Sequence, residues 1–234
     1  MWSSTVYPWP ELEERLESCR GRFALDVVRH GQTEANAARR FSGAGDVELT
    51  ELGHHQAHEM GSRLSGRYDM AFHSSLSRSR LTLELALGSS DATAECVIED
   101  GRLSERSLGV LEGRQTRPIA EYEQGDFSYA PEGGEPYTSV AQRVLSFLAD
   151  LADLADAAAG RSQPLRALAC THVGPMRILV PVLKQSGEPP HVLTARYPNA
   201  EVFSFEVSKL KIPPFLGSAL LQAGADGYEP SATA

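Results

Sequence analysis

The chain has 234 residues, which fits one α/β domain or two small domains and is long enough to bury a sizeable hydrophobic core. Apolar residues make up 41% of the sequence and charged residues 23%, which is the composition of an ordinary globular protein. The net charge of −9 argues against nucleic acid or an anionic membrane surface as the main partner, although the local field of a pocket can still attract a small anion.

The cysteines and the N-terminal segment bear on the compartment. Cys19, Cys96 and Cys170 lie far apart and show no CxxC spacing, a pattern typical of reduced thiols. The first 20 residues lack the basic start and apolar run of a secretory signal, and no apolar stretch approaches the ~20 residues of a membrane span. We therefore expect a cytoplasmic protein with no membrane segment.

Apolar segments rich in β-formers alternate along the chain with segments of helical period. A lead-in over residues 1–20 contains a short acidic helix, residues 106–138 form a cap-like insertion without firm period, and residues 211–234 form a loosely held tail. The expected strands cover residues 22–30, 68–75, 94–100, 165–174 and 201–210. The expected helices cover residues 33–40, 50–65, 76–87, 139–160 and 175–187, the last of these opened by Pro175.

This alternation predicts one domain, with its core at about residues 21–210, built as a three-layer sandwich: a mostly parallel central sheet with helices on both faces. In such sheets ligands bind beyond the carboxyl ends of the strands. Polar groups follow three expected strands, at Arg29-His30, at His73-Ser74-Ser75 and at Thr171-His172. The sequence therefore predicts a binding site at that edge of the sheet.

The segment "DVVRHGQTEAN" suggests the chemistry of this site. Arg29 offers a planar set of donors suited to phosphate oxygens. Gly31 lets the backbone approach a ligand closely, and a helix that begins near Gln32 or Thr33 would point free amides at the same place. A neutral His30 among these groups is an activated nucleophile if one ring nitrogen is held by a hydrogen bond. The alternative is a buried structural histidine beside an ordinary ion pair.

Further motifs follow in order: "FSGAGDVELTELGHHQA", "HSSLSRSRLT", "RLSERSLGVLEG", "GGEP" and "THVGPMRIL". Together with "RHGQTEAN" they resemble the histidine phosphatase superfamily, whose members have the phosphoglycerate mutase-like fold. The resemblance covers roughly residues 23–207. It implies an enzyme that forms a phosphohistidine and needs neither metal nor cofactor, because arginines and histidines neutralise the phosphoryl oxygens.

The resemblance also implies roles for individual residues. His30 matches the nucleophile, Arg29 and Arg78 match the two phosphate-clamping arginines, and His172 matches the second histidine, which binds the phosphoryl oxygens. Glu105 matches the acid that protonates the leaving oxygen, a role for which it must be protonated near neutral pH. The expected substrate contacts are Gly31, Thr33, Asn36, Arg106, Arg114, Arg117, Tyr122 and Val173.

Departures from the family pattern bear on the reaction. Val173 stands where the family commonly has a small residue, and "GGEP" replaces the commoner "GES". Arg106 after the glutamate is similar to the mutase branch, but the compact segment 114–134 has Arg114 and Arg117 apart instead of the paired arginines of that branch. This favours hydrolysis by water, with the 106–138 cap setting specificity or, equally, forming a polar surface loop.

We therefore expect a phosphomonoesterase that acts on a small phosphorylated metabolite, in a monomer or a homodimer. A phosphoglycerate-type mutase primed by a bisphosphorylated compound is the first alternative, and a non-catalytic phosphate-binding regulatory protein is the second. A metal pair at His54 and His58 lacks a third ligand of suitable spacing, and no nucleotide-binding glycine motif is present.

Overall fold

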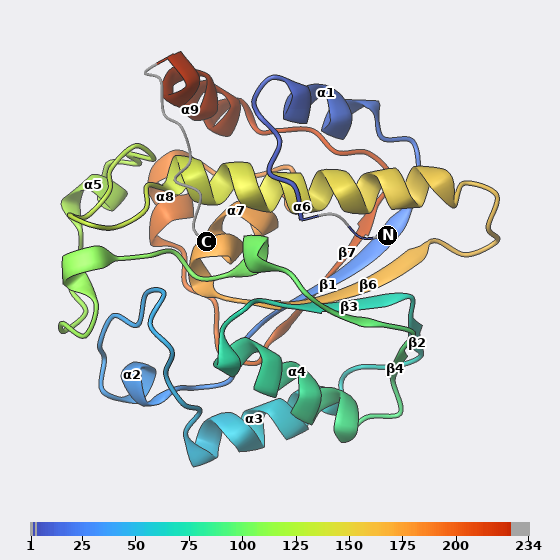
Figure 1. Ribbon diagram of the computed structural model, residues 1–234, viewed down its shortest axis with the longest axis horizontal. Helices are drawn as coiled ribbons and strands as arrows, with labels where there is room; N and C mark the ends of the chain where they lie inside the picture. The colour runs from blue at the N-terminus through green and yellow to red at the C-terminus, as the bar shows by residue number, and fades with distance from the viewer. Residues whose placement is uncertain (1, 3, 226–234) are drawn as a thin grey trace.

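The computed structural model describes residue 2 and residues 4–225, and a five-stranded sheet forms its centre (Figure 1). Across this sheet the strand order is β5-β3-β6-β1-β7. The first four of these strands are parallel to their neighbours, and β7 alone among the five is antiparallel, paired with β1. The strands are β1 (Phe23–Arg29), β3 (Met70–His73), β5 (Val97–Glu99), β6 (Leu165–Thr171) and β7 (Val202–Val207). The mostly parallel sheet predicted from the sequence is confirmed.

Helices cover both faces of the sheet (Figure 1). The longest, α6 (Tyr137–Ala157), lies on one face together with α7 (Val173–Lys184), while α3 (Glu51–Gly61) and α4 (Ser77–Gly88) cover the other. None of the helices among the described residues is both long enough and apolar enough to cross a membrane. The remaining helical segments are α1 (Glu11–Ser18), α2 (Glu34–Ala37), η1 (Gly101–Leu103), η2 (Gly109–Leu111), α5 (Ala120–Glu123), α8 (Pro189–Thr194) and α9 (Pro214–Ala225).

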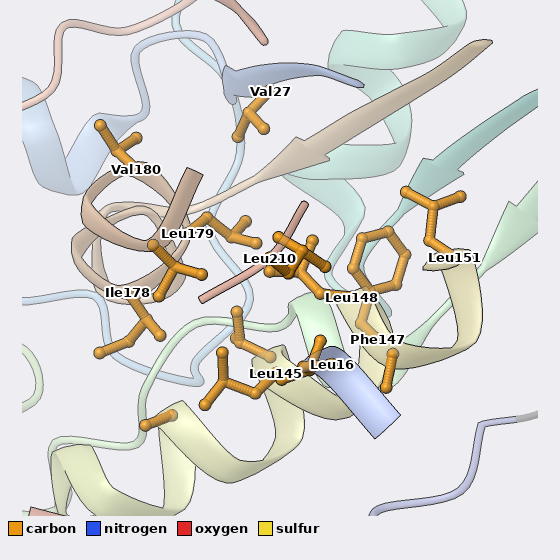
Figure 2. Packing of buried hydrophobic residues seen from close by; sticks show 14 of the residues in the cluster. Leu16, Val27, Leu145, Phe147, Leu148, Leu151, Ile178, Leu179, Val180 and Leu210 are labelled. Atoms are coloured by element: carbon orange, nitrogen blue, oxygen red, sulfur yellow. The ribbon is translucent and has the colours of Figure 1, made fainter. Parts of the chain in front are cut away.

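Two hydrophobic cores result, one on each face, because successive strand residues point to opposite sides. In β1, Val27 belongs to the core beneath α6 and α7, whereas the next residue, Val28, belongs to the core beneath α3 and α4. Figure 2 shows Val27 facing Leu148 of α6 and Leu179 of α7. Buried apolar residues on both faces explain why the strand sequences are nearly continuous apolar runs.

Residues 7–16 and 212–225 are more firmly packed than the sequence suggested. Leu12 and Leu16 of α1 are fully buried against α6, and Tyr7 donates to the Asp150 carboxylate (2.5 Å). The expectation of a loose tail after Lys211 is wrong for residues 212–225, because α9 buries Leu216 and Leu220 in the same core. Residues 226–234 of that tail lie outside the described residues.

Several predicted boundaries also differ. Asp69 accepts a hydrogen bond from the backbone of Arg166 (2.8 Å) and separates β2 (Arg67–Tyr68) from β3, so the strand expected over 68–75 is two strands. The strand expected over 94–100 likewise divides into β4 (Thr93–Ala94), which pairs with β2, and β5. The α7 helix begins at Val173, two residues before Pro175.

The sheet register brings three strand ends together. Arg29 of β1 lies opposite Thr171 of β6, and His73 of β3 lies opposite Cys170 of β6. The residues that follow, His30, Ser74 and His172, therefore meet at one edge. The parallel strands thus place the three polar signals of the sequence in one region, as predicted.

Candidate active site

His30 follows β1 directly and is only 3% exposed. Its Nδ1 lies 2.7 Å from the carbonyl oxygen of Gly31. Because a carbonyl oxygen can only accept, Nδ1 carries the proton and Nε2 keeps a free lone pair. The backbone therefore holds the ring in the tautomer that an attacking Nε2 requires.

His172 faces His30 from the end of β6, with the ring centroids 4.9 Å apart and the planes inclined by 53°. It is fully buried and is the N-cap residue of α7. Its Nε2 lies 2.7 Å from the hydroxyl oxygen of Ser74, while its buried Nδ1 has no hydrogen-bond partner within the described chain. One ring nitrogen of each histidine is thus available to a ligand.

The environment keeps both rings neutral. Burial lowers the pKa of His30 well below its ordinary value of 6.5, and the charges of Arg29 and Arg78 lower it further. Burial also lowers the pKa of His172 well below 6.5, with added contributions from the His30 ring and from both guanidinium groups. A buried cation next to two arginines is unfavourable, so the neutral imidazole is the resting form.

Two guanidinium groups adjoin the histidines. Arg29 donates from Nη1 to the carbonyl oxygen of Tyr197 (2.7 Å), and Arg78 donates to the carbonyl oxygens of Gly45 (2.8 Å) and Gly43 (2.9 Å). The Nε atoms of both arginines are buried without a partner in the described chain. Burial lowers the pKa of each guanidinium, but arginine keeps its charge at neutral pH.

Glu105 lies at the start of α7. Its Oε1 accepts hydrogen bonds from the backbone N–H groups of Arg106 (2.8 Å) and Gly174 (3.0 Å). The preceding segment is attached to the end of β6, because the Thr171 hydroxyl donates to the carbonyl oxygen of Leu103 (2.6 Å). The carboxyl group expected to be the acid is therefore bound to the backbone of Gly174, two residues after His172, and it is close enough to Arg29 and Arg78 to act on the pKa of both guanidinium groups.

The turn after His30 differs from the expected amide cradle. The N–H of Gly31 donates to Thr82 Oγ1 (2.9 Å), that of Gln32 to Gln56 Oε1 (2.8 Å), and that of Thr33 to Asn36 Oδ1 (3.2 Å). These amides are thus used within the protein. The expectation of free amides at this turn is wrong, because α2 is only four residues long and its entry is bound to α3 and α4.

Gly31 and Thr33 have structural roles here. A Cβ on Gly31 would lie 2.5 Å from the carbonyl oxygen of Gly53, so the glycine permits the close approach of α3. Thr33 is fully buried, and its hydroxyl accepts from the backbone N–H of Asn36 in a capping box. The Thr33 side chain is therefore occupied within the protein, whereas the backbone approach to a ligand expected at Gly31 stays a prediction.

Asn36 stays a candidate contact. Its Oδ1 accepts from Thr33 N (3.2 Å) and from Asn199 Nδ2 (3.3 Å), and Asn199 also donates to the carbonyl oxygen of His30 (2.8 Å). The Asn36 Nδ2 group makes no hydrogen bond within the described residues. Asn36 is therefore tied to the backbone of His30 with its donor group still available.

The structure encloses Arg106 and Tyr122 in the cap. The Arg106 guanidinium donates to the carbonyl oxygens of Glu135 and Tyr129 and to the Tyr122 hydroxyl, and it is 2% exposed. The Tyr122 ring packs edge-on against Tyr129 and Tyr137, with centroids 5.7 and 5.5 Å away, and burial raises its pKa to about 12. The expectation that these two side chains contact substrate is not supported.

Arg114 and Arg117 are exposed between η2 and α5, and Val173 is partly exposed at the start of α7. The backbone N–H of Val173 makes no hydrogen bond within the described residues, in contrast to that of Gly174. A free amide at the start of a 12-residue helix favours an anion. The substrate contacts expected for these three residues stay predictions.

The sequence reasoning missed three residues at this site. Ser74 stood in the quoted "HSSLS" but was given no task, and Asn199 follows α8 in an unremarkable loop. Arg177 lies one turn after Val173 and donates to the carbonyl oxygen of Ala195 (3.0 Å) and to Tyr137 Oη (2.8 Å). Ser74 carried a signal as a polar residue that follows a strand, and Arg177 carried one through its i,i+4 spacing from Val173.

No group of three or more histidine, cysteine, aspartate or glutamate side chains suited to a metal occurs in the described part of the chain. The expectation of a reaction without metal or cofactor stays a prediction. The groups that the site does present are two guanidinium groups, the free ring nitrogens of His30 and His172, and one backbone amide. They define an α/β protein with a buried cationic site that is suited to an anion and holds a free imidazole nitrogen.

Comparison with known proteins assigns the family. The chain belongs to the histidine phosphatase superfamily (branch 1), whose family model matches residues 25–211. The resemblance described from the motifs is thereby confirmed, and members of this superfamily include both phosphatases and mutases.

Two curated relatives represent these two activities. The chain is 36% identical over 132 residues to a 2,3-bisphosphoglycerate-dependent phosphoglycerate mutase of Cytophaga hutchinsonii, covering 53% of this chain and 62% of that protein. It is 34% identical over 154 residues to a glucosyl-3-phosphoglycerate phosphatase of Mycolicibacterium vanbaalenii, covering 62% of this chain and 68% of that one. The chain thus spans less than two thirds of the length of this mutase.

The fold is similar to that of solved structures. The mycobacterial glucosyl-3-phosphoglycerate phosphatase in complex with VO3 aligns with a TM-score of 0.64 at 26% identity, covering 77% of this chain and 90% of that chain. YhfR of Bacillus stearothermophilus aligns with a TM-score of 0.64 at 26% identity, covering 81% of this chain and 95% of that chain. The phosphoglycerate mutase-like fold is therefore confirmed.

Proposed function

We propose that this protein is a phosphomonoesterase that hydrolyses a small phosphorylated metabolite through a phosphohistidine on His30. One observation carries the proposal: His30 is neutral, its Nδ1 proton is held by the Gly31 carbonyl, and its Nε2 is free beside two buried guanidinium groups. A histidine buried for structural reasons has both nitrogens satisfied by the protein. The free Nε2 therefore supports a role as nucleophile.

In the first step, Nε2 of His30 attacks phosphorus and the ester P–O bond breaks. The protonated carboxyl of Glu105 gives its proton to the leaving alkoxide oxygen, which departs as an alcohol. Arg29, Arg78 and His172 neutralise and bind the equatorial phosphoryl oxygens. The backbone amide of Val173 offers one further donor at the same place.

In the second step, a water molecule replaces the alcohol. The Glu105 carboxylate takes a proton from this water, whose oxygen attacks phosphorus while the P–N bond to His30 breaks. Inorganic phosphate leaves, and the free imidazole and the protonated Glu105 are restored. No metal enters this sequence, because arginine and imidazole donors balance the phosphoryl charge.

The test compares the wild type with His30→Ala in hydrolysis of an aryl phosphate. We expect His30→Ala to lower kcat by about 10⁴-fold or more, as the loss of a covalent nucleophile does. Rapid quenching at alkaline pH, where a phosphoramidate survives, should trap labelled phosphate on the wild type only. Equal rates in the two proteins would contradict catalysis, and no rate in either would favour a non-catalytic phosphate-binding protein.

A phosphoglycerate-type mutase is the second candidate, and the 36% identity to a protein named as a mutase favours it. In the mutase reaction the phosphohistidine returns its phosphoryl group to a bound product, so activity requires a bisphosphorylated primer. We expect phosphate release without such a primer. Phosphoglycerate interconversion that appears only when a bisphosphoglycerate is added would identify the mutase.

The buried cationic site suits a phosphate ester, and the named relatives suggest which esters to test first. The relative from M. vanbaalenii is named for a phosphorylated sugar–glycerate compound, which makes sugar phosphates and phosphoglycerates the first compounds to screen. Release of inorganic phosphate from a panel of such esters would rank them. The location in the cytoplasm, supported by three unpaired cysteines, and the homodimer stay predictions.

A further inference from the structure

Ser74 is a fully buried residue just beyond the end of β3, in contact with His172. Its hydroxyl oxygen lies 2.7 Å from His172 Nε2 and accepts a hydrogen bond from the backbone N–H of Leu76 (3.3 Å). The Ser74 backbone is itself held, because its N–H donates to Ser79 Oγ (3.1 Å). The serine is therefore fixed in position before any ligand binds.

The bonds of this hydroxyl decide where the His172 proton lies. A serine hydroxyl has one proton to donate, and Leu76 N–H is itself a donor, so His172 Nε2 is the only acceptor that the described residues offer. If Nε2 carried a proton, the buried Ser74 hydroxyl would donate to nothing, which is unfavourable. The satisfied arrangement has Ser74 donating to an unprotonated Nε2.

The surroundings of His172 Nδ1 lead to the same position for the ring proton. A neutral imidazole carries one proton, so an unprotonated Nε2 leaves that proton on Nδ1, which is buried and has no hydrogen-bond partner among the described residues. A phosphate dianion offers acceptor oxygens and no proton. An Nδ1–H group next to it makes a hydrogen bond, whereas an Nδ1 lone pair would be repelled.

We propose that Ser74 is a positioning residue for the reaction: its hydroxyl donates to Nε2 of His172 and holds the His172 proton on Nδ1, where it binds a phosphoryl oxygen. The contact with a phosphoryl oxygen rests on the proposed function, whereas the position of the His172 proton does not. His30 and His172 then have the same Nδ1–H tautomer for opposite purposes. In His30 the backbone takes the proton and frees Nε2 to attack, and in His172 the serine occupies Nε2 and frees the proton for the phosphate.

The first test reads the wild-type protein and needs no activity; a site variant serves only to assign the signals. Proton–nitrogen NMR spectra of the wild type with ¹⁵N-labelled histidine report which ring nitrogen carries the proton, and a His172→Gln sample assigns the His172 signals. We expect a protonated Nδ1 and an unprotonated Nε2 at neutral pH. A protonated Nε2 would overturn the proposal, whatever the enzyme does with phosphate esters.

The second test measures the consequence with inorganic phosphate and an aryl phosphate. Ser74→Ala removes the donor to Nε2, so we expect kcat/KM to fall by about 10²-fold and phosphate inhibition to weaken by about tenfold. Ser74→Thr keeps the hydroxyl and should restore most of both. Failure of Ser74→Thr to recover any activity while folded would contradict the proposal.

Ser146→Ala is the matched control, because Ser146 is also a fully buried serine with two hydrogen bonds, but it lies on α6 against Tyr7. It should keep its kcat/KM while losing some thermal stability. A loss of rate in Ser146→Ala as large as in Ser74→Ala would show a general packing effect and overturn the proposal. If Ser74→Ala does not fold, the NMR spectrum of the wild type still decides.

Discussion

His30 and His172 face each other across the carboxyl edge of the sheet with their ring centroids 4.9 Å apart, and burial holds both in the neutral form. This pairing has a measurable cost at low pH. The unfolded chain protonates its histidines near pH 6.5, whereas the folded chain keeps these two neutral to lower pH. Between their folded pKa values and 6.5 the unfolded state therefore binds more protons.

We expect the free energy of unfolding to decrease as the pH falls below about 6.5, by up to ~1.4 kcal/mol per pH unit for each of the two histidines. Urea unfolding at several pH values between about 7.5 and 5.5 measures the slope. In His172→Gln one of the two proton uptakes is absent, so the slope should become shallower. A slope unchanged by this substitution would mean that His172 does not resist protonation in the folded protein.

Arg78 should not tolerate lysine. Its guanidinium bridges the carbonyl oxygens of Gly43 and Gly45, and its buried Nε has no partner in the part of the chain that the structure describes. A single ammonium group cannot reproduce this set of donors. We expect Arg78→Lys to lower kcat/KM for an aryl phosphate by about 10²–10³.

The control lies two residues further along the same helix. Arg80 is about half exposed and pairs with Glu84 on the surface (3.1 Å). Arg80→Lys should leave kcat/KM within roughly twofold of the wild type, since exposed ion pairs contribute little. Equal losses in the two variants would remove Arg78 from the phosphate site.

Gly174→Ala should impair the proton donor selectively. A Cβ at residue 174 would overlap the Glu105 carboxylate oxygen that its own backbone N–H binds, so the acid must move. An acid that protonates the leaving oxygen matters most for poor leaving groups. We therefore expect kcat for an alkyl phosphate to fall about 10²-fold or more, and kcat for an activated aryl phosphate to fall much less.

Gly88→Ala controls for the change itself, because nothing lies within 4 Å of a Cβ there, at the end of α4. It should leave the ratio of alkyl to aryl rates unchanged. If Gly174→Ala lowers both rates by the same factor, Glu105 does not protonate the leaving group.

Arg106→Met tests whether this arginine supports the cap. Its removal leaves two carbonyl oxygens and the Tyr122 hydroxyl without their donor, so we expect the free energy of unfolding to fall by about 1–3 kcal/mol. The inhibition constant for inorganic phosphate should stay unchanged, because the guanidinium is enclosed by the cap. Arg80→Met, at a half-exposed position on α4 outside the site, should change neither quantity. Weaker phosphate inhibition in Arg106→Met at unchanged stability would return this residue to the substrate contacts.

The architecture was largely readable from the sequence. The strand that ends at Arg29 buries both of its faces. Burial on both faces requires a nearly continuous run of apolar residues, and such a run is visible in the sequence. The polar breaks at residues 30, 74 and 172 marked the site, because parallel strands end at the same edge. The α9 helix escaped prediction, since its apolar residues pack against parts of the chain that are distant in sequence, among them α6 and Phe127 of the cap.

Predictions made from local sequence were wrong where a group has its hydrogen-bond partner far away in the chain. The amides after His30 looked free because nothing nearby in sequence satisfies them, yet Thr82 and Gln56 accept two of these hydrogen bonds. Arg106 looked like a substrate contact because it follows Glu105, and the fold of the cap turned its guanidinium inward. Two residues that are adjacent in sequence can point their side chains to different parts of the structure.

The order of residues is enough to specify which chemical groups follow each strand, because local period and turn chemistry set the residue at which a strand ends. Which of those groups share hydrogen bonds depends on how the strands pack. Ser74 and His172 are 98 residues apart and meet because β3 and β6 are adjacent in the sheet. A hydrogen bond can select the tautomer of a histidine only if its donor and acceptor atoms lie about 3 Å apart or closer. That separation is set by the packing of the sheet and not by the order of residues.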